Sequence, residues 1–209
     1  MTIHPTRFTR NSIAMLTAAI LFAVGCGKGS SDQKKLDSSA KKIDSGLMNQ
    51  LKQTGTVGDY QLSLPEDYTF VEDPKSATRK FKMATWKGRV KEGDIPSLLS
   101  LAILTDSRTV NEAGKNMRQM LVNFSAGMTD GAGIQITKRE QTETGNWGSM
   151  QYSRFLWSGS LADGTVVKGM AYGAIDNGQV VAVIGENFGT NADSANQLLE
   201  AAISTLKKK

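Results

Sequence analysis

The chain of 209 residues contains one cysteine, Cys26, and one histidine, His4. Thiols and imidazoles are the side chains that most often act as nucleophiles, general bases or zinc ligands. Here both precede the bulk of the chain, and Cys26 lies in the stretch LFAVGCGKGS, residues 21–30. A cysteine that ends an apolar run and opens a glycine-rich polar stretch indicates processing chemistry at its thiol rather than catalysis inside a folded domain.

The residues before Cys26 have the pattern of a secretory signal peptide. Arg7 and Arg10 supply a positive n-region without acidic residues, and residues 13–24 form an apolar h-region. This run is shorter than the ~20 residues that cross a bilayer as a helix. We therefore expect residues 1–25 to be a signal peptide, and a permanent transmembrane span is the weaker interpretation.

The motif LFAVGC at residues 21–26 resembles the lipobox of bacterial lipoproteins. The resemblance implies that the Cys26 thiol receives a diacylglycerol and that cleavage makes the modified cysteine the new N-terminus. At roughly 0.8 kcal/mol per buried CH₂, one acyl chain binds marginally and two or more hold firmly. We therefore expect a stable membrane anchor of palmitate-type chains at Cys26. The alternative is an ordinary signal peptide with an incidental cysteine.

The same resemblance implies a location in the bacterial cell envelope, facing the periplasm or the exterior. The residue after the anchor is Gly27. In some Gram-negative bacteria an aspartate at this position favours retention in the inner membrane. The outer membrane is therefore slightly favoured.

Removal of residues 1–25 would leave no histidine and no thiol besides the anchor. Serine–histidine and cysteine–histidine nucleophiles need an imidazole base, typical zinc sites need histidine or thiolate ligands, and no D-x-D-x-D-G calcium loop is present. We therefore expect a protein that is not an enzyme and has no cofactor and no metal site. Two alternatives stay open, a hydrolase using two carboxylates about 5–10 Å apart and a carrier of an apolar ligand in a methionine-lined pocket.

The net charge of the chain is +5, and the excess of basic residues lies outside the expected domain. Of the 25 basic and 20 acidic side chains, two basic ones lie in residues 1–25, and six basic and three acidic ones lie in residues 28–52. The remaining charges balance. Nucleic-acid binding requires a basic face on a domain, so we expect no nucleic-acid partner.

The polarity of the chain divides it into three parts. Residues 1–25 are the signal peptide, residues 26–57 the lipidated cysteine and a flexible or helical tether, and residues 58–209 one globular domain. Within the tether an apolar stripe at helical spacing predicts either a fluctuating helix in a solvated linker or a helix that lies on the membrane or docks against the domain; its members are Leu36, Ala40, Ile43, Leu47 and Leu51.

The pattern of the domain predicts an α+β fold with a largely antiparallel sheet flanked by two main helices. Alternating or continuous apolar runs predict strands, with a two-residue hairpin turn at Asn177-Gly178. Helices are expected over about 110–128 and from about residue 191. The expected strands are DYQLSLP, TRKFKMATWKG, LLSLAILT, GIQITKREQTE, WGSMQYSRFLW, GTVVKGMAYGAI and GQVVAVIGENF.

This order of elements resembles the PsbP-like α/β/α sandwich, and within it the bacterial DcrB-like lipoproteins. The resemblance spans about residues 58–207 and rests on LSLPEDY, the strand ending at Trp86, LLSLAIL, AGKNMRQMLVNF, GNWGSMQYSRFLW and LLEAAISTLK. It implies a non-enzymatic binding or scaffolding domain with a possible protein partner in the envelope.

One basic strand is the best candidate for a partner-binding surface. Its candidate residues are Lys80, Lys82, Trp86, Lys87 and Arg89. Alternation along a strand puts Lys80, Lys82 and Trp86 on one face, where Trp86 could serve as an aromatic anchor beside the lysines. The alternative is an edge strand protected by its lysines against aggregation, with Trp86 covered by a neighbouring loop.

Overall fold

The computed structural model describes residues 44–71, 77–78, 81–90, 94–140, 142–189 and 192–209. Cys26, the signal peptide and most of the expected tether lie outside these ranges. Within them, no helix combines the length and apolarity that a membrane span requires.

In the described residues, the larger of two sheets has nine strands, all paired antiparallel. Its order is β3-β5-β6-β11-β10-β9-β7, with β4 also beside β5 and β8 also beside β9. The strands are β3 Thr69–Val71, β4 Ala77–Thr78, β5 Phe81–Lys87, β6 Leu98–Leu104, β7 Gln135–Arg139, β8 Glu143–Trp147, β9 Met150–Ser160, β10 Val166–Asp176 and β11 Gln179–Phe188.

A smaller sheet packs against one face of the larger one. It consists of β1 (Leu51–Val57), β2 (Tyr60–Pro65) and β12 (Lys207–Lys208), in the order β1-β2-β12, and the short helix α1 (Ser45–Met48) precedes β1. A Cβ atom on Gly55 would lie 2.6 Å from the Trp86 indole, so β1 approaches the large sheet closely at this point.

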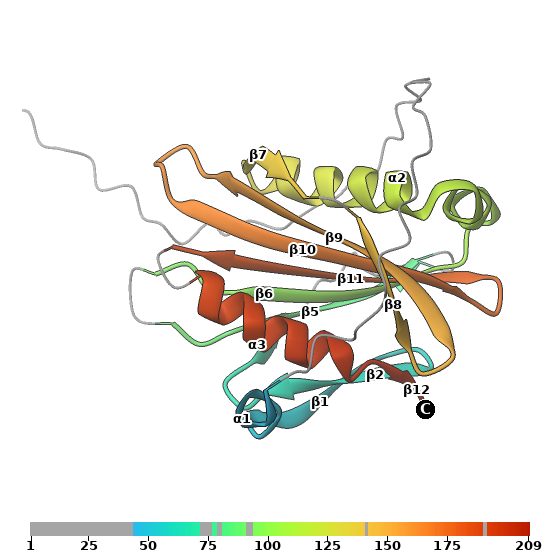
Figure 1. The fold of residues 1–209 in the computed structure, drawn as a ribbon, viewed down its shortest axis with the longest axis horizontal. Coiled ribbons are helices and arrows are strands. Elements are labelled where there is room, and N and C mark those ends of the chain that lie inside the picture. The colour runs from blue at the N-terminus through green and yellow to red at the C-terminus, as the bar shows by residue number, and fades with distance from the viewer. Residues whose placement is uncertain (1–43, 72–76, 79–80, 91–93, 141, 190–191) are drawn as a thin grey trace, which may run out of the picture.

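Two long helices cover opposite faces of the large sheet, α2 (Ser107–Gly131) and α3 (Ala192–Ser204). Figure 1 shows α2 above the sheet and α3 below it, beside the small sheet. Asp106 caps the N-terminus of α2, because its carboxylate accepts a 3.0 Å hydrogen bond from the Thr109 amide. The helix is interrupted at Asn116, where φ is −158°.

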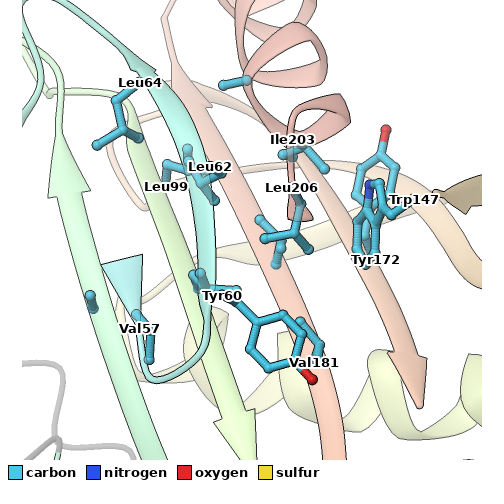
Figure 2. Packing of buried hydrophobic residues seen from close by; sticks show 14 of the residues in the cluster. Val57, Tyr60, Leu62, Leu64, Leu99, Trp147, Tyr172, Val181, Ile203 and Leu206 are labelled. Atoms are coloured by element: carbon cyan, nitrogen blue, oxygen red, sulfur yellow. The ribbon is translucent and has the colours of Figure 1, made fainter. Parts of the chain in front are cut away.

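Each face of the large sheet has its own apolar core. Alternation along β6 sends Leu101 and Ile103 into the core on the α3 side and Ala102 and Leu104 into the core on the α2 side. Figure 2 shows the α3-side core, where Tyr60, Leu62, Leu206 and Ile203 from β2, the C-terminal segment and α3 gather over the large sheet. Burial on both faces explains why β6 and β11 read as continuous apolar runs.

The sequence pattern predicted most of these elements. The α+β fold with a large antiparallel sheet is confirmed, and so is the hairpin turn, with φ of 48° at Asn177 and 72° at Gly178 between β10 and β11. The last helix ends at Ser204, and Lys207 and Lys208 pair with β2.

The folded chain also begins before residue 58. Within the segment expected as tether, α1 ends at Met48 and β1 pairs with β2 through Val57. The apolar pattern did not reveal β1 because only Gly55 and Val57 are buried and glycine has no side chain. Leu36, Ala40 and Ile43 lie outside the described residues, while Leu47 lies in α1 and Leu51 begins β1.

The sandwich has two distinct ends. The pocket end carries the β1–β2 turn at Gly58 and Asp59, the β10–β11 turn, and the C-terminal strand β12. The tether end carries the starts of β1, β6 and β10 and the ends of β5 and β11. In Figure 1 the pocket end is on the right, near the marked C-terminus, and the arrowhead of β11 points to the tether end on the left.

A buried carboxyl group lies on the α2 face of β11 near the tether end. Glu186 is 3% exposed, its Oε1 has no hydrogen-bond partner, and its strand neighbours are Gly169 and Leu98. The Trp157 indole lies across Gly169, where a Cβ atom would be 2.0 Å from the ring. Burial raises the pKa of Glu186 to about 7.

We expect Glu186→Gln to remove a pH-dependent destabilisation. The pKa of Glu186 is higher in the folded chain than in the unfolded chain, so between these two pKa values the folded chain binds an extra proton. The free energy of unfolding therefore falls as the pH rises through about 7. At about 1.4 kcal/mol per pH unit the loss reaches up to about 3 kcal/mol by pH 8. Urea unfolding of both proteins from pH 5 to pH 8 measures it, and parallel pH profiles would contradict it.

Candidate functional site

The predicted basic strand is β5, and its residues do not form one surface. Lys82 is exposed at the pocket end, whereas Lys87 and Arg89 are exposed at the tether end. Lys80 lies outside the described residues. The strand is also interior to the sheet, because β6 lies on one side and β3 and β4 lie on the other.

Trp86 is not the exposed anchor that the sequence suggested. It shares a face with Lys82, as alternation predicted, but this face is the α3-side core, and Trp86 is 6% exposed. The strand β1 covers it at Gly55, with Leu64 of β2 nearby. The exposed aromatic neighbour is Phe70 on β3, which pairs with Trp86 and lies 6.5 Å from it between ring centroids.

A small pocket opens at the pocket end, with a volume of about 60 Å³. Its lining combines the β1–β2 turn with the start of β5, the end of β6 and the start of β11, which are far apart in the chain. The lining residues are Gly58, Asp59, Tyr60, Phe81, Lys82, Ile103, Thr105 and Gln179. Among the predicted partner-binding residues that the structure describes, Lys82 alone lies at this concave site.

Tyr60 holds the wall of this pocket through its hydroxyl group. The Tyr60 hydroxyl donates to Asp176 Oδ2 at 2.6 Å, and Gln179 Nε2 donates to the Tyr60 oxygen at 2.9 Å. Burial, followed by the hydrogen bond to Asp176, raises the pKa of Tyr60 to about 12. The phenol therefore stays protonated and fixes the β1–β2 turn against the β10–β11 turn.

The basic side chains around the pocket differ in their availability. Lys208 Nζ lies 3.4 Å from Asp176, and Lys209 Nζ donates to the Gly58 carbonyl at 3.1 Å. The hydrogen bond from Tyr60, followed by the charge of Lys208, lowers the pKa of Asp176. In the described part of the chain no ion pair involves Lys82, so its ammonium group is free to contact a ligand.

The size of the pocket limits what it can hold. Drug-sized ligands occupy pockets of about 300–1,000 Å³, whereas about 60 Å³ holds a few waters or the tip of one side chain. One amine and one amide beside an apolar wall suit a small polar group carried by a larger partner. Lys82 would attract a carboxylate, while Asp59 opposes a second negative charge.

Sequence reasoning missed most of this site. The sequence pattern indicated only that Tyr60 is an inward-facing strand residue, and Gln179 and Thr105 belong to no motif. The available signal was the two turn sequences, Gly58-Asp59 and Asn177-Gly178, but nothing in them indicates that the two turns meet through one phenol.

A second polar cluster joins the β8–β9 hairpin to α3. Arg154 Nε donates to Glu143 at 2.7 Å, and Arg154 Nη1 donates to Glu200 of α3 at 2.9 Å and to the Tyr172 hydroxyl at 3.1 Å. Trp147 stacks on Tyr172 with 5.9 Å between centroids. Arg154 satisfies the carboxylates itself, so the cluster is a structural cross-link. Among the described residues, no three His, Cys, Asp or Glu side chains are placed to hold a metal ion.

No protein-family model matches the chain, and no curated protein matches it. Several solved structures, however, are similar to this chain. The PsbP of the cyanobacterium Synechocystis sp. PCC 6803 has a TM-score of 0.50 at 16% identity, over 75% of this chain and 92% of that chain. The fold is PsbP-like. This confirms the expected PsbP-like architecture, and at this identity the likeness concerns the fold alone.

Two further solved structures are similar at lower scores. LpqN of Mycobacterium tuberculosis, described as involved in cell envelope biogenesis, has a TM-score of 0.40 at 14% identity, over 70% of this chain and 79% of its own. A Pseudomonas aeruginosa protein of unknown function, described as a putative regulator, has a TM-score of 0.45 at 10% identity, over 75% of this chain and 96% of its own.

We expect Tyr60→Phe to loosen the pocket. The variant keeps the buried ring but removes the donor to Asp176, which should cost about 1–2 kcal/mol of unfolding free energy. Because the phenol stabilises the charged carboxylate, its loss raises the pKa of Asp176 toward the ordinary value. NMR titration of the Asp176 carboxyl carbon measures this change.

The matched control is Tyr68→Phe, which removes a buried phenol at the tether end. It should leave the Asp176 titration unchanged. Equal Asp176 titrations in the native protein and the Tyr60 variant would show that the hydrogen bond does not govern that carboxylate.

Proposed function

We propose that this protein is a lipid-anchored, non-enzymatic lipoprotein of the cell envelope that acts as a binding or scaffolding module. The observation that carries the proposal is the pocket at the end of the sandwich remote from the start of the described chain. It is flanked by Lys82, which forms no ion pair among the described residues. The lipobox-like motif at Cys26 supports anchoring at the opposite end. The domain would then hold its pocket away from the membrane surface.

The partner would be a protein carrying an acidic side chain or a terminal carboxylate. Lys82 supplies the charge, the Gln179 side chain lies in the same lining, and Phe81 and Ile103 supply apolar contact. Such a pocket recognises one group of a larger interface, because a volume of about 60 Å³ cannot enclose a separate ligand. The Tyr60–Asp176 hydrogen bond keeps the lining preorganised, which lowers the entropy lost on binding.

The two alternative functions have less support. A carboxylate hydrolase needs one acid with a raised pKa, but the hydrogen bond from Tyr60 lowers the pKa of Asp176 beside the pocket, and the buried Glu186 is on the other face of the sheet. A carrier of an apolar ligand would expose methionines to a large cavity, whereas Met120, Met128 and Met170 are buried within the two cores.

Replacement of the cysteine tests the anchor. We expect Cys26→Ser to move the protein from the membrane fraction of a bacterial envelope to the soluble fraction, because no diacylglycerol can be attached. Separation of inner and outer membranes on a density gradient then places the native protein, with the outer membrane expected. A serine variant that stays with the membrane and a native protein of unmodified mass would contradict the anchor.

A photo-crosslinking amino acid tests the pocket. Placed at Gln179, it should capture a discrete partner from intact envelopes, and Lys82→Glu should reduce the yield several-fold by charge reversal. Lys115→Glu is the matched control, because it reverses an exposed lysine on α2 and should leave the yield unchanged. An equal loss of crosslinking yield in both variants, or no loss in either, would show that Lys82 is not part of the interface.

A further inference from the structure

The exposed large apolar side chains are concentrated at one end of the sandwich. In the described part of the chain they are Phe70 (58% exposed), Val166 (48%), Val90 (42%), Met48 (40%) and Ile175 (39%). The first four lie at the tether end, and Ile175 alone lies at the pocket end, opposite Val180. Single exposed apolar residues are ordinary, but their gathering at one end distinguishes that end chemically.

Four separate elements bring these side chains to the same end. Met48 ends α1, just before Leu51 pairs with Pro65. Phe70 lies on the edge strand β3, Val90 follows the end of β5, and Val166 begins β10. The antiparallel register places all of these positions at the tether end of the sheets, although they are widely spaced in the sequence.

The described part of the chain begins at the same end. Asp44 caps α1, and residues 27–43 connect it to Cys26. At ~3.5 Å per extended residue this connection reaches about 60 Å at most. A lipid on Cys26 would therefore join the domain to the bilayer through its tether end.

The exposed charges at the tether end have both signs and do not form a basic patch among the described residues. The basic side chains there include Lys52, Lys87 and Arg89, and the acidic ones include Glu66, Asp67, Asp94 and Asp163. Attraction of a bilayer to this end therefore rests on apolar contact and not on charge. A surface with apolar side chains among both charge signs suits the interfacial layer of a bilayer, where side chains enter the acyl boundary and charges stay among the headgroups.

We propose that the tether end docks on the phospholipid surface, with Phe70, Val90, Val166 and Met48 in the interfacial layer. This rests on the proposed lipid anchor at Cys26. Docking would orient the domain, because β10 runs from Val166 to Asp176 across the sandwich. At ~3.3 Å per residue the pocket would stand about 35 Å above the bilayer.

Single-cysteine labelling tests the proposal on the full, lipidated protein. Acylation of Cys26 would leave no competing thiol, so cysteine introduced at Val90, at Val166 or, as a matched control at the opposite end, at Ile175 can carry an environment-sensitive fluorophore. The protein is reconstituted into vesicles of phosphatidylethanolamine and phosphatidylglycerol containing a small fraction of nitroxide-labelled lipid, which quenches nearby fluorophores.

We expect several-fold stronger quenching at positions 90 and 166 than at position 175. Phe70→Ser should weaken the quenching at position 90, and salt at about 0.5 M should have little effect, because apolar contact is not screened. Equal weak quenching at all three positions of vesicle-bound protein would overturn docking while leaving the anchor intact. Quenching that is strongest at position 175, or that salt abolishes, would also overturn it. Failure of the protein to float with vesicles would overturn the anchor, and the docking with it.

Discussion

The structure depends on two strands, β6 and β11, that are buried on both faces. Their pairing from Leu98–Glu186 to Leu104–Val180 places one set of side chains against α2 and the alternate set against α3 and the small sheet. A shift of the register by one residue would exchange the two cores. The same register sets where the turns and strand ends lie, and therefore which residues meet at the pocket end and at the tether end.

The pocket results from contact between the small sheet and the turns of the large one. Tyr60 enters the α3-side core with its ring and meets Asp176 and Gln179 with its hydroxyl group. The C-terminal lysines reinforce the same end, since Lys208 lies near Asp176 and the Lys209 ammonium donates to the Gly58 carbonyl. The pocket is therefore built from two backbone turns, one phenol that joins them, and the side chains of Lys82 and Gln179.

Local patterns predicted the strands and helices whose apolar residues repeat regularly, including β2, β5, β6, β10, β11 and both long helices. They did not predict β1, where a buried glycine leaves no apolar signal, or β8, whose pattern at Glu143–Trp147 is mostly polar. They left open whether Trp86 is an exposed anchor or is covered by a neighbouring segment, and the structure shows that it is covered. Alternation placed it correctly on the face of Lys82, but alternation cannot tell whether another strand covers that face.

The sequence by itself determined the α+β order of elements, the absence of imidazole and free thiol chemistry from the expected domain, and the motif at Cys26, because these follow from residue type and local periodicity. Tertiary structure alone decided that Lys82 joins Tyr60 and Gln179 at one pocket, that Trp86 is buried beneath Gly55, and that Phe70, Val90 and Val166 share one end. The reason is physical. Each of these neighbours is set by strand pairing and by the packing of one sheet on another, which join residues distant in the chain and leave no trace in local sequence.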